Sequence, residues 1–211
     1  MQIDCNLSKK KVISQRGQYR KGGVGRLCWD YRDNQVIFNI EEGMKKIIDI
    51  GCGEGITLEK LIKKFPDRDI KGIDCAKENV EICKGYGLPA TQGTVYELNI
   101  KDDSVDCCIF TEVIEHLEYP QKALKEIHRI LRKDGLLLLL FPNDFIFKIA
   151  RLLTFKFKEA FYEPRHLRQW TPWTIRHLLN EVGFKIIKQK SIPFYFWMVS
   201  LHHLVLARKK Q

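Results

Sequence analysis

The chain has 211 residues, a length that suits one α/β domain with an appendage, and its hydrophobic content of 45% suits a globular protein with a real core. No apolar run is long enough to span a bilayer, which excludes a membrane-spanning helix. The net charge is +10, and basic clusters in residues 1–26 and 145–168 would attract an acidic substrate, an anionic membrane or RNA, although a solvated basic surface accounts for them as well.

The first 40 residues are expected to form a basic, helical N-terminal extension, and strand patterns alternate with helical patterns after it. Strands are predicted at 45–50, 70–74, 89–93, 105–110 and 136–141, and helices at 56–65, 76–87 and 119–135. Unbroken apolar strands that alternate with helices indicate a mostly parallel sheet covered on both faces. We expect one α/β domain that spans residues 1–211.

The pattern changes after Pro142. Residues 143–163 mix large apolar and basic residues at helical spacing, and we expect a lid insertion on the substrate side at 143–168. Such an amphipathic surface suits an apolar acceptor with an acidic group or a membrane face, and a lid that packs on its own sheet also accounts for it. The last predicted elements are a helix at 171–184 and strands at 184–189 and 201–209.

Residues 47–55, IIDIGCGEG, place a strand directly against a glycine-rich loop. Gly51 and Gly53 let main-chain N–H groups approach a ligand, and the helix that begins at Ile56 adds a partial positive charge. A dinucleotide site would need GxGxxG, whereas the order here is GxGxG. Asp74 ends the second strand about 20 residues further on, where an acid accepts ribose hydroxyls. The expected ligand is a nucleoside, and the short glycine pattern favours one without a pyrophosphate.

Four stretches together resemble a class I S-adenosylmethionine-dependent methyltransferase, in the group that includes the ubiquinone-biosynthesis O-methyltransferases: IIDIGCGEG, IKGID, VDCCIFTEVIEHLEYPQKALKEIHRILRKDGLLLLLFPN and HLRQWTPWTIRHLLNEVGF. The resemblance implies a Rossmann-like, doubly wound, seven-stranded sheet that is mostly parallel, with the last strand antiparallel and paired in a late hairpin. It also implies that S-adenosyl-L-methionine is the cofactor and S-adenosyl-L-homocysteine the product.

The resemblance assigns cofactor contacts to the ends of the strands. The implied set is Arg32, Asp49, Gly51, Cys52, Gly53, Asp74, Cys75, Thr94, Val95 and Thr111. Asp49 would support the loop and Asp74 would hold the ribose, while Cys75, Thr94 and Val95 would flank the adenine and Thr111 would line the methionine part. Arg32 stands where ubiquinone-type relatives bind the cofactor carboxylate with an arginine. The alternative, given equal weight, is that Arg32 is an ordinary basic residue at the surface.

Candidate catalytic residues follow the fourth predicted strand, at 105–110. Glu112, Glu115 and His116 are spaced i, i+3 and i+4, which is one face of a helical turn. His116 is a candidate general base or substrate contact, and a packing role is its alternative. The ubiquinone O-methyltransferases bind a divalent cation with the matching acid–acid–histidine set, but many relatives use no metal, and we expect none here. The resemblance places His166 near the substrate mouth, and a loop histidine is the alternative.

We therefore expect an enzyme that transfers a methyl group to a small-molecule or lipid-like acceptor by in-line displacement, with O-methylation favoured. Two alternatives are an RNA methyltransferase that uses the basic extension and a non-catalytic S-adenosylmethionine-binding module. Peripheral membrane contact is a further expectation from the basic and apolar lid. Seven cysteines without a CxxC pair and the lack of a signal pattern indicate reduced thiols and a cytoplasmic protein. The acceptor and the oligomeric state are not readable from the sequence.

Overall fold

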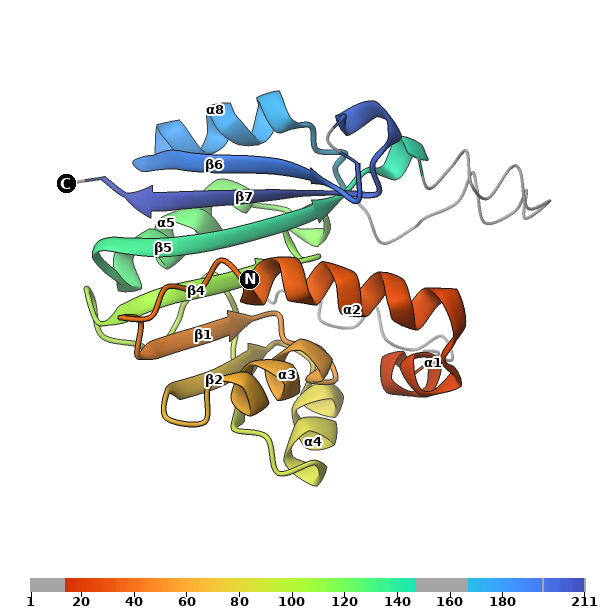
Figure 1. The fold of residues 1–211 in the computed structure, drawn as a ribbon. Coiled ribbons are helices and arrows are strands. Elements are labelled where there is room, and N and C mark those ends of the chain that lie inside the picture. Colours follow the sequence, from red (N-terminus) through yellow and green to blue (C-terminus); the bar gives the residue numbers. More distant parts are fainter. Residues whose placement is uncertain (1–13, 147–166, 195, 211) are drawn as a thin grey trace. The chain divides into compact units, whose positions relative to one another are not determined.

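A seven-stranded sheet organises the structure, a computed structural model that describes residues 14–146, 167–194 and 196–210. The strand order is β3-β2-β1-β4-β5-β7-β6 (Figure 1). This order, with β7 antiparallel to β5 and to β6, confirms the predicted Rossmann-like sheet and its late hairpin. The chain divides into two compact units, residues 1–99 and 100–211.

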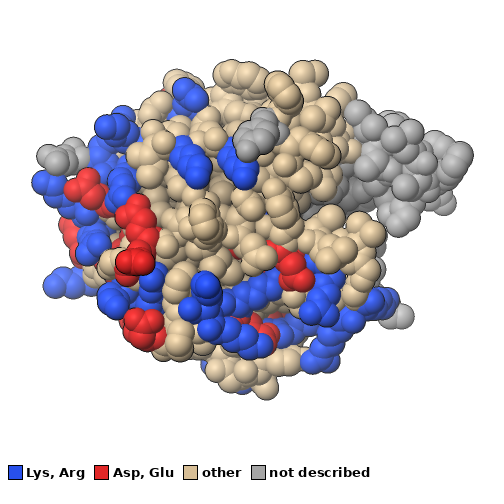
Figure 2. Space-filling view, in the orientation of Figure 1, with Lys and Arg blue, Asp and Glu red and all other residues tan. Residues whose placement is uncertain are grey.

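Residues 1–99 carry the glycine-rich loop. Their elements are α1 (Gln15–Lys21), α2 (Gly23–Ile37), β1 (Lys46–Ile50), α3 (Ile56–Lys64), β2 (Asp69–Asp74), α4 (Lys77–Gly85) and β3 (Ala90–Gln92). β1 and β2 are parallel and in register from Lys46↔Asp69 to Ile50↔Ile73, so both strands end at the same edge. The isoleucines of β1 are buried because helices cover both faces of a parallel strand. Figure 2 shows Lys and Arg side chains gathered where Figure 1 places α1 to α4.

Residues 100–211 hold the longest strands. Their elements are β4 (Val105–Thr111), η2 (Ile114–His116), α5 (Pro120–Ile130), β5 (Leu131–Pro142), α8 (Pro172–Val182), β6 (Phe184–Ile192), η3 (Trp197–Val199) and β7 (His202–Lys209). The five consecutive leucines of β5, residues 136–140, are fully buried, since β4 and β7 pair with the strand on its two sides. Thr171 caps α8, and Gly183 ends it in the left-handed conformation.

The largest differences from the predicted boundaries lie at two places. The helix predicted at 119–135 ends at Ile130, because Leu131 already pairs with Val105 of β4 and opens β5. The strand predicted at 184–189 continues to Ile192, because its partner β7 pairs with it over that whole length. Most of the predicted lid, and His166 with it, lies outside the described residues. No helix in the described ranges is long and apolar enough to cross a membrane.

Candidate functional site

The loop after β1 is tied to the end of β2. The main-chain N–H groups of Gly51 and Cys52 donate to the carbonyl oxygen of Ile73, at 2.7 and 3.1 Å. The N–H of Gly53 donates to Oδ2 of Asp74 at 2.8 Å. The predicted glycine and acid residues therefore meet, and the acid organises the loop even without a ligand.

Asp74 is buried and serves as an acceptor for its own surroundings. Its Oδ1 accepts from the main-chain N–H of Ala76 at 2.9 Å and from Nδ2 of Asn79 at 3.0 Å. A carboxylate has about four acceptor positions, so three bonds within the chain leave capacity for a ribose hydroxyl. Asn79 is a supporting residue that the sequence did not reveal.

Asp49, in β1, is the most unusual ionisable group of residues 1–99. It is 1% exposed, and neither carboxylate oxygen has a hydrogen-bond partner among the residues that the structure describes. Burial raises its pKa to about 8, with further contributions from Asp33, Asp74 and Cys83, while Arg32 acts in the opposite direction. A buried carboxyl group without a partner suits a ligand that brings positive charge or a donor.

Arg32 lies in a buried charge cluster. Its Nε and Nη2 donate to Oδ1 of Asp33 at 3.0 and 2.9 Å, and Nζ of Lys60 donates to Oδ2 of Asp33 at 2.7 Å. The Arg32 side chain is 13% exposed, which argues against the surface-base alternative. Asp33 and Lys60 were not predicted, because no local pattern links α2 with α3.

The start of α1 is bound to the glycine-rich loop. The carboxylate of Glu54 accepts from Oγ of Ser14 and from the main-chain N–H groups of Gln15 and Arg16, at 2.8, 2.8 and 2.7 Å. Arg16 in turn donates from Nε to the Glu54 carbonyl oxygen at 2.6 Å. Gly53 has φ +54°, and a Cβ there would lie 2.8 Å from Oε1 of Gln15. This contact was not predictable from local pattern, because its partners are about 40 residues apart and only the Ser14 cap has a local signal.

The other predicted cofactor residues of this unit lie close to the ends of β1, β2 and β3. Cys52 and Val95 are buried, Thr94 is half-buried and Cys75 is exposed. A hydrogen bond with the thiol of Cys83, together with burial, raises the pKa of the Cys52 thiol, so that thiol is neutral. These positions are compatible with the predicted role of the four residues, which is to line the cofactor site.

The end of β4, in residues 100–211, carries a strained acid. Thr111 is half-buried, and Glu112 has φ +57°, the left-handed region that non-glycine residues rarely adopt. Oε1 of Glu112 lies 3.3 Å from Nε2 of His202 in β7. His202 therefore joins the candidate residues at this strand end.

The acid–acid–histidine set does not come together as one group. Glu115 is buried, and its Oε1 lies 3.8 Å from Nε2 of His116, whose side chain is 39% exposed. Glu112 approaches His202 instead. Among the described residues, no three His, Cys, Asp or Glu side chains are arranged to hold a metal ion. His116 remains accessible as a base.

The sequence and the fold match known proteins. Residues 48–139 match the family described as "Methyltransferase domain". A Streptomyces fradiae transposon protein is 35% identical over 46% of this chain and 30% of its own length. An uncharacterized protein of Methanocaldococcus jannaschii is 27% identical over 78% of this chain and 80% of its own.

Solved structures agree in fold. A methyltransferase of Thermotoga maritima superposes with a TM-score of 0.70 at 20% identity, over 94% of this chain and 96% of its own. Uncharacterized methyltransferase YcgJ of Bacillus subtilis is 25% identical over 72% of this chain and 62% of its own, and its crystal structure superposes with a TM-score of 0.64. Residues 48–139 therefore form a methyltransferase domain, and the match to a probable S-adenosylmethionine-dependent methyltransferase of Mycolicibacterium smegmatis, 28% identical over 67% of this chain and 52% of its own length, indicates S-adenosyl-L-methionine as the cofactor.

Proposed function

We propose that this chain transfers a methyl group from S-adenosyl-L-methionine to a hydroxyl group of a small-molecule or lipid-like acceptor. The observation that carries the proposal is the exit of β1, where the half-buried Gly51 and Gly53 lie beside the buried carboxylates of Asp49 and Asp74. Glycine admits a bulky ligand, and the two acids suit a ligand with hydroxyl groups and positive charge.

The residues at this site fit the cofactor. When bound, S-adenosylmethionine supplies a methyl group on a positively charged sulfur. An acceptor atom attacks the carbon of that methyl group in line with the sulfur, which leaves with the bonding electrons. Asp74 would bind the ribose, and Asp49 would compensate positive charge near the glycine-rich loop. Arg32, held by Asp33, would bind the cofactor carboxylate. Holding two reactants in line accounts for most of the rate that such an enzyme needs.

His116 would accept the proton that the acceptor hydroxyl loses. Its side chain is accessible, and Glu115 lies close enough to stabilise the protonated ring. Glu112 and His202 form a second acid–histidine pair at the same strand end and would orient the acceptor. His166 stays a prediction for the substrate mouth.

The names of two relatives support an aromatic, partly apolar acceptor. An Oryza sativa relative, 23% identical over 77% of this chain, is named 2-methyl-6-phytyl-1,4-hydroquinone methyltransferase 2. A Solanum habrochaites relative, 25% identical over 91% of this chain, is named myricetin 3'/5'-O-methyltransferase 1. RNA is less well supported, because Arg16 and Arg20 of the basic extension bind Glu54 and Tyr86 of the same unit.

Calorimetry with S-adenosylmethionine and S-adenosylhomocysteine tests the cofactor, and a screen with labelled methyl groups tests the acceptor. The screen compares alkylated hydroquinones, simple phenols, amines and RNA. We expect both nucleosides to bind and label to enter a hydroxyl compound. Label in amines or RNA alone would refute the acceptor assignment, and binding without transfer to any class would favour the non-catalytic module.

A further inference from the structure

The connection between β6 and β7 exposes apolar side chains in a group. Phe194, Phe196, Met198 and Val199 are between 52% and 77% exposed, and we call these four residues the apolar tip. Single exposed apolar residues are normal on a protein surface. A contiguous group of them marks a binding surface, because leaving it in water costs free energy that folding does not recover.

The apolar tip stands on an ordered base. Nδ2 of Asn143, at the end of β5, donates to the carbonyl oxygen of Trp197 at 2.7 Å, and the fully buried Ser200 donates to the carbonyl oxygen of Phe194. The ring of Trp197 packs on Phe141, with centroids 5.6 Å apart. The backbone between these anchors is therefore held in place, and it directs the four side chains outward.

More apolar side chains lie at the same end of the unit. The main-chain N–H of Asn143 donates to the carbonyl oxygen of Leu201 at 2.7 Å, which places the exposed Phe145 near the tip. α8 runs back along β6 and stops short of the far end of that strand (Figure 1), and Trp173 lies in the first turn of the helix. Trp173 is also exposed. The group is thus larger than the tip itself.

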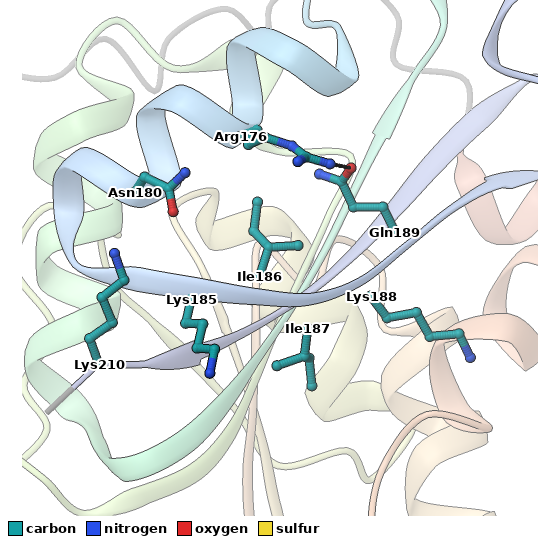
Figure 3. A pocket seen from close by; sticks show the side chains of 8 residues that line it. All are labelled: Arg176, Asn180, Lys185, Ile186, Ile187, Lys188, Gln189 and Lys210. Atoms are coloured by element: carbon teal, nitrogen blue, oxygen red, sulfur yellow. Dashed lines mark hydrogen bonds between the residues drawn. The ribbon is translucent and has the colours of Figure 1, made fainter.

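Cations lie behind the tip, along α8 and β6. We call Arg176, Lys188 and Lys190 the basic rim. At about 3.3 Å per residue, Lys190 and Lys188 lie about 7 and 13 Å before the end of β6, and Arg176 follows Trp173 by one helical turn. Figure 3 shows Arg176 and Lys188 at a hollow whose described lining residues include four basic side chains and no acid.

The charge pattern continues to the tip itself. In Figure 2 the surface over the β6–β7 connection is largely uncharged, and Lys and Arg side chains are set back from it. Within the described residues 141–146, 193–194 and 196–210, Asp144 is the sole acidic residue, and it is half-buried. The apolar tip therefore lies outermost at this end, and the basic rim lies behind it.

We propose that this end of residues 100–211 docks on an anionic lipid bilayer. The tip would enter the boundary between headgroups and acyl chains, and the basic rim would lie at the level of the phosphates. A second copy or an apolar protein partner would also cover the tip, but neither accounts for the cations set behind it. The inference goes beyond the proposed function, because docking requires no methyl transfer.

Flotation with lipid vesicles tests the proposal on the full chain. One set of vesicles is phosphatidylcholine, and the other is phosphatidylcholine with an equal amount of phosphatidylglycerol. We expect clear binding to the anionic set, reduced by high salt because salt screens the rim. Equal or absent binding to both sets would overturn the proposal.

Two double variants separate the parts of the surface. Phe196→Ser with Met198→Ser should lower binding to the anionic vesicles at least about tenfold, since two apolar side chains no longer enter the lipid. Lys188→Gln with Lys190→Gln should lower it about tenfold and remove most of the salt dependence. All four side chains lie at the surface or partly so, and both variants should keep their affinity for S-adenosylmethionine.

Matched controls come from residues 1–99. The control variants are Phe38→Ser and Lys64→Gln. Phe38 is 85% exposed at the end of α2, and Lys64 is exposed at the end of α3. These variants should bind vesicles like the unchanged chain. An equal loss in the controls would show non-specific adsorption and overturn the proposal. Light scattering that finds a dimer, lost in the tip variant while vesicle binding persists, would assign the tip to a second copy instead.

Discussion

The exit of β1 and the end of β4 are strand ends of the same kind, but they present different chemistry. The first combines two half-buried glycines, Gly51 and Gly53, with two buried carboxylates. The second presents acid–histidine pairs, one of them on the strained Glu112. We expect the first site to bind the cofactor through the glycine-rich loop and its carboxylates, and the second to take the proton of the acceptor.

The largest expected effect is at Asp74, on the cofactor side of this comparison. Asp74→Ala should weaken S-adenosylmethionine binding by about 10²-fold or more, since charge-assisted hydrogen bonds to the ribose are worth about 1.5–3 kcal/mol each. Calorimetry measures the affinity. Asp74→Asn is the matched control, because it keeps the shape and part of the bonding to Gly53 and Ala76. Unchanged affinity in the alanine variant would refute the ribose assignment.

His116 should show the opposite behaviour, on the acceptor side. His116→Ala should lower turnover by about 10²–10⁴-fold, the range for loss of a general base, and should leave cofactor affinity unchanged. The defect should shrink at high pH, where a phenolic acceptor loses its proton without help. Turnover equal to that of the unchanged chain, or a defect independent of pH, would leave His116 only a packing role.

Asp49 should couple cofactor binding to pH. Because burial raises the pKa of Asp49 to about 8, most of the free protein carries a protonated carboxyl at pH 7. A positively charged cofactor favours the ionised form, so affinity should rise with pH by up to about tenfold per unit below that pKa. The uncharged sulfur of S-adenosylhomocysteine should give a smaller slope. Asp49→Asn should remove the difference between the two ligands.

The same shift sets the sign of a stability effect. Asp49 binds its proton more tightly when folded than when unfolded, where the pKa is about 4, so the free energy of unfolding should fall as pH rises from about 4 to about 8. Asp49→Asn should flatten that fall in the cofactor-free protein. Urea titrations across this pH range measure the slope, and the same slope in both proteins would contradict the account.

The smallest expected effect is at Arg16, which touches the loop from outside. Arg16→Ala should remove the hydrogen bond to the Glu54 carbonyl oxygen and the ion pair with Glu59, loosen the start of α1, and weaken cofactor binding several-fold, because the loop loses support on that side. Hydrogen exchange should speed up in α1 without global unfolding. Arg20→Ala is the matched control, since Arg20 bonds only to exposed Tyr86 among the contacts described for it. Equal effects from both variants would argue against a specific role.

Local pattern was enough to predict the cofactor side of the fold. Glycine at alternate positions and an acid at the end of the next strand are typical of a nucleoside site, and parallel pairing brings the two strand ends together. Strands β1, β4 and β5 were predictable for a related reason, since each contains an apolar run.

Contacts between distant segments could not be predicted. Residues 131–135 continue the helical spacing of α5, but pairing of Leu131 with β4 overrides that local preference. The contacts of Glu54 with α1 and of Glu112 with His202 join residues about 40 and 90 positions apart, and a single sequence carries no signal for either contact. The acceptor side depends on such contacts, which is why its residues were predicted less completely.

A crystal structure with S-adenosylmethionine is the most direct test of the account. We predict the cofactor at the exit of β1, with its ribose hydroxyls on Asp74 and its methionine part against Gly51 and Gly53. A cofactor bound elsewhere on the chain, or an empty loop in crystals of a protein that binds it in solution, would contradict the assignment.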